Sequence, residues 1–217
     1  KNTKSGLARA HALWTLDGMG VWDESLVVNA ISDKDMEVRL AALRIAGEYL
    51  LINQVSDSLL DAVAQSLPDD DLDIAAQRLM SLSFYKKQMK AYAVRTGHIE
   101  RVMKAAGKFL NHDIIAKAFM VALNPAEYIP VLEDLSKDPR FQDKTHPLPQ
   151  HLAFACFAMA GQKSLTALLD LTAQIQPEFQ SALLKGLRLG NTGRGYVSRD
   201  LIRYDSKPAG LTKLEEV

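Results

Sequence analysis

Histidine and cysteine are the side chains of this sequence best suited to metal binding or nucleophilic catalysis, but their spacing favours neither. None of the five histidines has a second one on the same predicted helix at a spacing that would place two ligands on one metal ion. The single cysteine, Cys156, lies in an apolar run and is predicted to be a buried thiol. No Ser-His-Asp set or pair of carboxylates can be placed either. We therefore expect no catalytic, metal-binding or cofactor-binding residue in this chain.

The glycine-rich segment 190–195, Gly-Asn-Thr-Gly-Arg-Gly, has the composition of a phosphate-binding loop. Such loops follow a strand and lead into a helix, whose first N–H groups then point at the phosphate. This segment follows a predicted helix and precedes no clear one. It therefore predicts a glycine cap at the end of that helix.

Charge is distributed unevenly along the chain, although its 26 basic and 26 acidic residues cancel. Residues 57–73 contain six aspartates and no lysine or arginine, whereas residues 86–108 are mostly basic. Within the basic segment Arg101, Lys104 and Lys108 share one helical face, which could bind nucleic acid or could be a solvated surface. The neighbouring acidic segment would repel a phosphate backbone, so nucleic-acid binding is kept as an alternative function.

Short alanine-rich helices recur along the chain and are the elements that would position any site. When these helices are superimposed, the shared alanines are separated by steps of 30, 34 and 40 residues, and Ala155 occupies that place in a fifth copy. The first four aligned alanines are Ala12, Ala42, Ala76 and Ala116. Such steps are typical of helix-pair repeats, in which a small residue allows two neighbouring helices to cross closely.

Each alanine-rich helix after the first follows a partner helix. Residues 32–35 form a turn within the first pair and offer Asp33 or Asp35 as the cap of its second helix. Residues 86–96 are predicted to add a helical turn, and the proline-rich residues 136–149 to form a surface loop. The predicted partner helices are 23–31, 56–67, 98–110 and 125–135, and the last pair is 162–173 with 177–189.

The sequence therefore predicts an all-α fold, and within that class an α-solenoid of about five or six helix pairs. The array would cover residues 1–189, and residues 190–217 would form a tail that packs on the array or leaves it. The composition, 47% hydrophobic and 24% charged, is that of a globular protein, and no apolar run approaches the about 18 residues of a membrane-spanning helix. Because the chain opens with Lys1, we expect it to be a fragment of a longer protein.

Three residues stand two places after the shared alanine in the first three aligned helices. They are Trp14, Arg44 and Arg78. In this alignment they form a partly exposed row along one face of the stack, so they are the candidate partner-binding residues. The alternative is that Trp14 and Trp22 cover the open end of the core, because the terminal unit of a repeat array needs a closing surface.

The turn and helix that begin at Asp33 resemble a HEAT repeat. Residues 33–42 are Asp-Lys-Asp-Met-Glu-Val-Arg-Leu-Ala-Ala and match the HEAT pattern Asp-x-Asp-x-x-Val-Arg-x-x-Ala. Later units keep the alanine and the apolar places but carry Asp73 and Asp113 where the arginine would stand. The resemblance implies a HEAT-like, armadillo-type superhelix whose later units are divergent.

A more particular resemblance covers residues 7–47. The string Leu-Trp-x-Leu-x-Gly at residues 13–18, followed by Val38-Arg39 and Arg44, is similar to the HEAT-repeat region of large exported bacterial dehydrogenase-like proteins. In that family a sorbosone/glucose dehydrogenase-type β-propeller precedes the repeats and a c-type cytochrome domain follows them. The resemblance implies a periplasmic or exported electron-transfer protein with haem c on a neighbouring domain. This chain has no CxxCH motif, and no active-site residue can be transferred to it.

These observations predict a non-catalytic helical-repeat scaffold or protein-interaction region within a larger dehydrogenase/cytochrome protein. Its partners would be another protein or neighbouring domains of the same chain. The alternative is a nucleic-acid-binding repeat that uses Arg101, Lys104 and Lys108.

Overall fold

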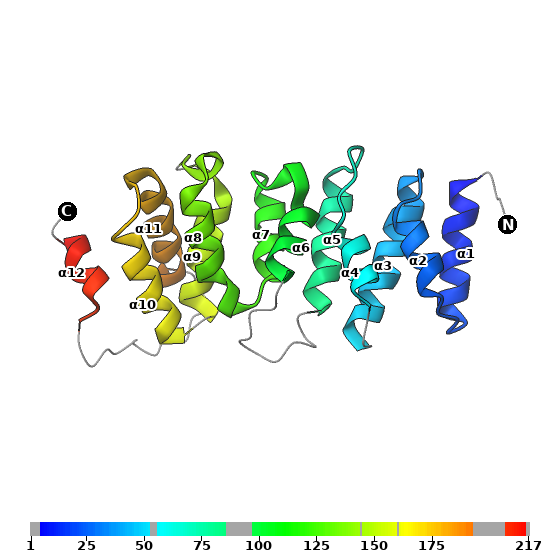
Figure 1. Ribbon diagram of the computed structural model, residues 1–217, viewed down its shortest axis with the longest axis horizontal. Coiled ribbons are helices and arrows are strands. Elements are labelled where there is room, and N and C mark those ends of the chain that lie inside the picture. Colours follow the sequence, from blue (N-terminus) through cyan, green and yellow to red (C-terminus); the bar gives the residue numbers. More distant parts are fainter. Residues whose placement is uncertain are drawn as a thin grey trace. The chain divides into compact units, whose positions relative to one another are not determined.

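The computed structural model is all-helical, as predicted (Figure 1). It describes residues 5–52, 56–85, 97–143, 145–159, 161–192 and 207–215. Within these ranges there are twelve α-helices and three short 3-10 helices, and no strand. The chain divides into two compact units: unit 1 comprises Lys1–Leu110 and Val121–Leu123, and unit 2 comprises Asn111–Met120 and Asn124–Val217.

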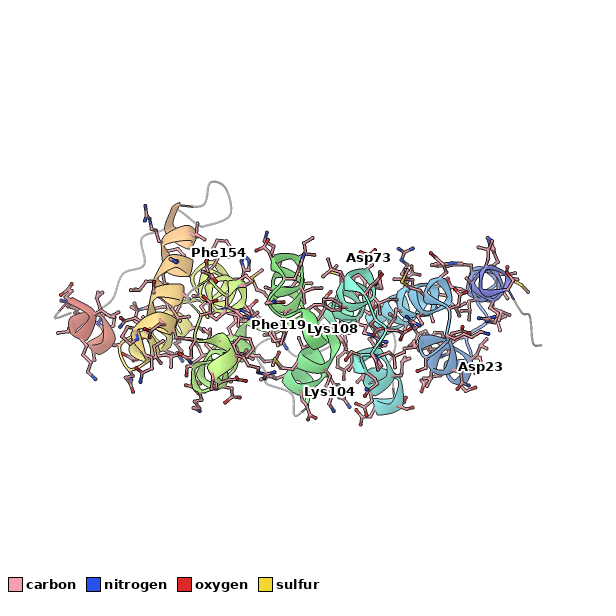
Figure 2. All side chains as sticks on the ribbon, turned by 90° about the horizontal axis from the view of Figure 1, so that it is seen from above. Asp23, Asp73, Lys104, Lys108, Phe119 and Phe154 are labelled. Atoms are coloured by element: carbon pink, nitrogen blue, oxygen red, sulfur yellow. The ribbon has the colours of Figure 1, made fainter. Side chains whose placement is uncertain are left out.

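The helices of unit 1 pack in two rows. In one row α3 contacts both α1 and α5, and in the other α4 contacts both α2 and α6. Figure 2 shows the rows on opposite sides of the unit, with Asp73 on α5 in one and Lys104 on α6 in the other. The helices and the short turn that follows them are α1 (Gly6–Gly18), α2 (Glu24–Ile31), α3 (Met36–Ile52), α4 (Asp57–Ala64), α5 (Leu72–Tyr85), α6 (His98–Ala106) and η2 (Gly107–Phe109).

Polar caps fix where the helices of unit 1 begin. The side chain of Asp23 accepts a hydrogen bond from the backbone N–H of Leu26 at the start of α2, and Ser56 caps α4 in the same way. The predicted cap of α3 is confirmed, because the Asp35 side chain accepts from the N–H of Glu37. These bonds satisfy helix-end N–H groups that have no partner within the helix.

The shared alanines do not have one common environment. Ala42 on α3 is fully buried, as close helix packing requires, whereas Ala12 is exposed and Ala76 is half-buried. Ala116 and Ala155 are also buried. The prediction that this position always marks a close crossing is therefore wrong for α1 and α5.

Unit 2 is built around α9, which contacts α8, α10 and α11. The contact of α9 with α11 is close, because a Cβ atom on Gly186 would lie 2.3 Å from the backbone oxygen of Gln150. The elements are α7 (Asp113–Ala122), η3 (Pro125–Glu127), α8 (Tyr128–Lys137), η4 (Pro139–Phe141), α9 (Pro147–Met159), α10 (Gly161–Thr172), α11 (Pro177–Thr192) and α12 (Ala209–Glu215).

Several segments of unit 2 depart from the prediction. The expected loop 136–149 contains η4, whose Phe141 is buried, and α9 already begins at Pro147. Gly190 lies within α11, which ends at Thr192, and a Cβ there would come 2.7 Å from the ring of Phe157. The rest of the predicted glycine cap, residues 193–195, lies outside the described residues. In the tail, α12 contacts α10, and the N–H of Gly210 donates to Asp170 at 2.8 Å. Residues 86–96 and most of the tail lie outside the described residues.

In the described part of the chain, no single helix has the length and apolar character needed to cross a membrane. One bent pair, Asp113–Ala122 with Pro125–Lys137, meets the criteria of length and composition when the two helices are taken together.

Candidate protein-binding site

An open groove of about 130 Å³ lies between α1 and α3 in unit 1. Two of the three candidate partner-binding residues, Trp14 and Arg44, line it from opposite helices. The full lining is Leu7, Ala10, His11 and Trp14 from α1, and Glu37, Leu40, Ala41 and Arg44 from α3. The structure therefore brings together the first two residues of the predicted row.

The groove is lined by both polar and apolar side chains and is partly open to solvent, and the exposed His11 lies among its lining residues. Leu7 is 63% exposed and Trp14 is 38% exposed, whereas Ala10 and Ala41 are buried. Leu7 and Trp14 stand two helical turns apart on α1, so they project from the same side of that helix. Exposed large apolar side chains that gather at one place commonly mark a protein contact.

Two opposite charges stand at the two ends of the α3 side of the groove. Glu37 lies in the first turn of α3, and Arg44 follows it seven residues later, about 10 Å along the helix axis. Neither side chain forms an ion pair with any residue of the described ranges. An exposed guanidinium beside an indole can bind a carboxylate and pack on the aromatic surface at the same time.

Arg78 does not belong to the exposed row, and the prediction that it does is wrong. Its side chain is fully buried, and burial lowers its pKa although Asp70 opposes the shift. Nε donates to Asp70 at 3.1 Å, and Nη1 donates to the backbone oxygens of Ala62 and Val63 at 3.1 and 3.0 Å. Arg78 therefore caps the carboxyl end of α4, where carbonyl groups lack helical partners.

Arg78 was misplaced because the sequence alignment of α3 with α5 is wrong by two residues. The buried positions of α3 and α5 match at a shift of 36 residues, not 34, because Val38, Leu43 and Ala46 then pair with the equally buried Ile74, Leu79 and Leu82. At this shift Arg78 takes the place of Ala42. The true counterpart of Arg44 is Met80, which is 40% exposed.

The corrected alignment shows a regular exposed surface on the α1–α3–α5 row. Its first line of equivalent residues is Leu7, Glu37 and Asp73, and its second is Trp14, Arg44 and Met80. Asp73 lies on the side of α5 away from α4 and α6 (Figure 2). We call this surface, defined by these six residues, the row face.

A second recurring feature is an arginine that reaches the acidic turn of the next helix pair. Arg9 on α1 binds Asp33 with N–O distances of 2.6 and 2.9 Å, and Arg39 on α3 pairs with Asp69 at 3.2 Å. Arg9 precedes Arg39 by 30 residues and Asp33 precedes Asp69 by 36, the same two shifts that relate the helices. The hydrogen bond from Arg9 is the main cause that lowers the pKa of Asp33.

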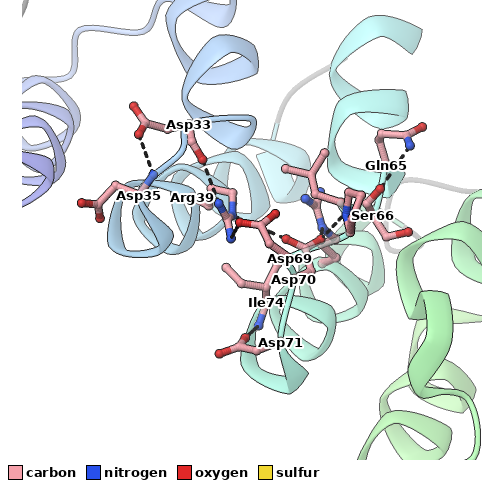
Figure 3. A network of polar contacts seen from close by, with 12 residues as sticks. Asp33, Asp35, Arg39, Gln65, Ser66, Asp69, Asp70, Asp71 and Ile74 are labelled. Atoms are coloured by element: carbon pink, nitrogen blue, oxygen red, sulfur yellow. Dashed lines mark hydrogen bonds and ion pairs between the residues drawn. The ribbon is translucent and has the colours of Figure 1, made fainter.

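Figure 3 shows how the second of these pairs extends into a buried cluster. Arg39 donates to the backbone oxygen of Asp33 at 2.9 Å, and its Nε lies 3.5 Å from the carboxylate of Asp70. Asp70 also receives Arg78, so one buried carboxylate lies between two buried guanidinium groups. Sequence reasoning missed this cluster, although the repeated Asp-x-Asp at residues 33–35 and 69–71 could have signalled it.

Trp22 and Trp14, the two residues of the tryptophan alternative, have different surroundings. Trp22 stacks on Tyr49 of α3 with ring centroids 3.5 Å apart and an interplanar angle of 5°. It therefore covers part of α3, as a closing residue would. Trp14 instead contributes an exposed wall to the groove.

The three basic residues of the nucleic-acid alternative all have partners inside unit 1. Arg101 binds Asp57 at 3.0 Å and Asp61 at 2.8 Å, and these bonds raise its pKa against the opposing effect of burial. Lys104 pairs with Glu100 at 2.8 Å. Lys108 donates to the Pro68 oxygen at 3.1 Å. The other basic residues of that run lie within 86–96, outside the described residues.

Two histidines and the cysteine lie in structural contacts. His98 is buried, with Nε2 3.1 Å from the backbone oxygen of Ala122, and His151 lies 2.7 Å from Asp113. Burial raises the pKa of the Cys156 thiol to about 12, so it is protonated at neutral pH. Among the described residues, no three His, Cys, Asp or Glu side chains converge in a way that could hold a metal ion.

The chain was compared with models of protein families, with characterised proteins and with solved structures. No family model, characterised protein or solved structure matches it.

Proposed function

We propose that this chain is a non-catalytic, HEAT-like helical-repeat scaffold whose row face binds another protein or a neighbouring domain. The main support is an asymmetry between the two rows of unit 1. Large exposed apolar residues lie on α1, α3 and α5, among them Leu7, Trp14 and Met80, whereas on α2, α4 and α6 the described part shows one, Leu26. A surface that exposes apolar side chains in a regular array is suited to protein contact.

The repeat character of the proposal is supported by packing and by polar contacts. Each inner helix of a row contacts the helix before it and the helix after it, which is the nearest-neighbour arrangement of a solenoid. The Arg9–Asp33 and Arg39–Asp69 pairs recur at the spacing of the helix pairs. A HEAT-like α-solenoid would produce both features.

Site-specific photo-crosslinking tests the proposed use of the row face. A benzophenone amino acid is placed at Met80 on α5 or at the exposed Ser58 on α4, as the matched control on the opposite row. We expect a discrete protein adduct in the producing cells from position 80 and none from position 58. Adducts of equal yield from both positions, or none from position 80, would contradict the proposal.

The wider context is also a proposal, and it is supported by the resemblance of residues 7–47. We infer that the chain holds a dehydrogenase domain and a c-type cytochrome domain in register within a larger exported protein. Sequencing the gene on both sides tests this inference directly. A CxxCH motif downstream and propeller repeats upstream are expected, and the absence of both would overturn the inference while leaving the row face untouched.

Nucleic-acid binding is not our proposal, because Arg101, Lys104 and Lys108 already contact acceptors of the protein. If these three side chains bound DNA phosphates, their present contacts within the protein would have to be replaced. A mobility shift with duplex DNA that weakens steeply as salt rises would restore this alternative. No shift at low salt is expected.

A further inference from the structure

The row face has an ordered pattern of charge that limits what can bind it. Its first line carries two carboxylates, Glu37 and Asp73, and its second line carries one cation, Arg44, between the apolar side chains of Trp14 and Met80. Neither the two carboxylates nor Arg44 form ion pairs with other described residues. A partner that binds here would therefore contact the negative Glu37 and the positive Arg44 about 10 Å apart, two turns along α3.

We propose that the groove between α1 and α3 binds one amphipathic helix of a protein partner, antiparallel to α3, with an acidic residue on Arg44 and a basic residue seven positions later beside Glu37. This inference rests on the proposed function and names the chemistry of its partner. In an antiparallel arrangement the acidic residue lies nearer the N-terminus of the partner helix, where the helix dipole also favours negative charge.

The size of the groove favours a side-chain anchor over a small-molecule ligand. Its volume of about 130 Å³ is below the range of about 300–1,000 Å³ that is usual for ligand pockets. Its buried lining residues are Ala10 and Ala41, and Leu7, Trp14 and Leu40 add apolar surface beside the exposed His11. One aliphatic side chain, three or four positions after the acidic residue of the partner, would lie between the two charged contacts.

The length of the groove favours a helix over an extended segment. Leu7 and Trp14 on one wall, and Glu37 and Arg44 on the other, each span two helical turns. A partner helix repeats its contacts at the same interval, so its acidic, aliphatic and basic residues would all face the groove. An extended chain would cover the same length in about three residues and would turn alternate side chains away.

The test uses two alanine-based helical peptides of about 16 residues, long enough to form isolated helix. The first carries an acidic residue, a leucine four positions later and a lysine seven positions later; the second carries lysine at both charged positions. Binding is followed by Trp14 fluorescence in a Trp22→Phe background, in which Trp14 is the single tryptophan, since the chain has only two. Circular dichroism is used to check that the two peptides are equally helical.

We expect the first peptide to bind about tenfold more tightly than the second, because the second places a lysine beside Arg44 in either direction of its helix. The Arg44→Gln variant should lose most of this preference, and the Lys104→Gln variant, on the opposite row, should keep it. In the Arg44→Glu variant the preference should invert, because both lysines of the second peptide then face a carboxylate. Melting curves establish that each variant is folded.

Equal affinity for both peptides, or a preference that does not invert in the Arg44→Glu variant, would overturn the inference. An unchanged Trp14 emission with both peptides would also overturn it. If position 80 still gives an adduct in the crosslinking experiment while both peptides fail, the row face is used but the charge pattern of the partner is wrong. If both experiments fail, the proposed function fails as well.

Discussion

Arg44 and Arg78 follow the shared alanine at the same distance in the sequence, yet one is exposed and the other is fully buried. Arg44 lines the groove between α1 and α3 and pairs with no acidic residue of the described ranges, whereas Arg78 binds Asp70 and the end of α4. When α3 and α5 are matched by burial, Arg78 replaces the small buried Ala42. Two neighbouring units thus fill one position differently, by close packing in α3 and by a buried ion network in α5.

The largest expected effect comes from breaking that network. Arg78→Ala removes a partner of the buried Asp70 and the guanidinium donor to the Ala62 and Val63 oxygens, of which Ala62 keeps only the N–H of Gln65, so it should lower the free energy of unfolding by about 3–5 kcal/mol. Arg44→Ala should change it by less than about 0.5 kcal/mol, because the side chain is exposed. Urea unfolding measures both, and equal losses would refute the comparison.

Overpacking the equivalent position in α3 should have the next largest effect. Ala42→Trp places a large side chain at a fully buried site and should cost about 1–3 kcal/mol or more, with a sharp drop in melting temperature. The matched control is Ala12→Trp, since Ala12 is exposed and should tolerate the change. A melting curve of Ala42→Trp identical to that of the native chain would show that α3 does not pack closely there.

A smaller, pH-dependent effect is expected from the Arg9–Asp33 pair. The pKa of Asp33 lies below its ordinary value of 3.8 in the folded protein, chiefly through the hydrogen bond from Arg9. The Arg9–Asp33 pair therefore stabilises the fold at pH values above 3.8, and this contribution to the free energy of unfolding is lost as pH falls through the lowered pKa. Asp33→Asn should melt earlier than the native chain near neutral pH, with the difference shrinking in acid. A difference that stays constant with pH would contradict this assignment.

Much of the helical architecture could be predicted because its signals are local. The caps Asp23 and Ser56, the turn at Asp33 and the apolar periodicity of α2 and α3 all lie within a few residues of the helices they define. The first residue of α9 was harder to predict from the sequence, because Pro147 is compatible with both a loop and a first helical turn.

The site could be predicted only in part, for a physical reason. Trp14 and Arg44 were identified because the alanine alignment placed them at equivalent positions of α1 and α3, and both line one groove. Arg78 was misplaced because a shared alanine in α3 and α5 was taken as the equivalent position, although buried apolar residues determine which side of a helix packs inward. Aligning Asp33 and Asp35 with Asp69 and Asp71 would have identified Met80 instead.

We propose that the row face binds a partner and that the cluster at Asp70 stabilises the fold. Two measurements on the Arg44→Glu variant separate these roles. In this variant the crosslinking yield at position 80 and the free energy of unfolding are measured together. The account predicts loss of the adduct with the unfolding free energy within about 0.5 kcal/mol of the native value. An undiminished adduct, or a loss of stability comparable to that of Arg78→Ala, would contradict it.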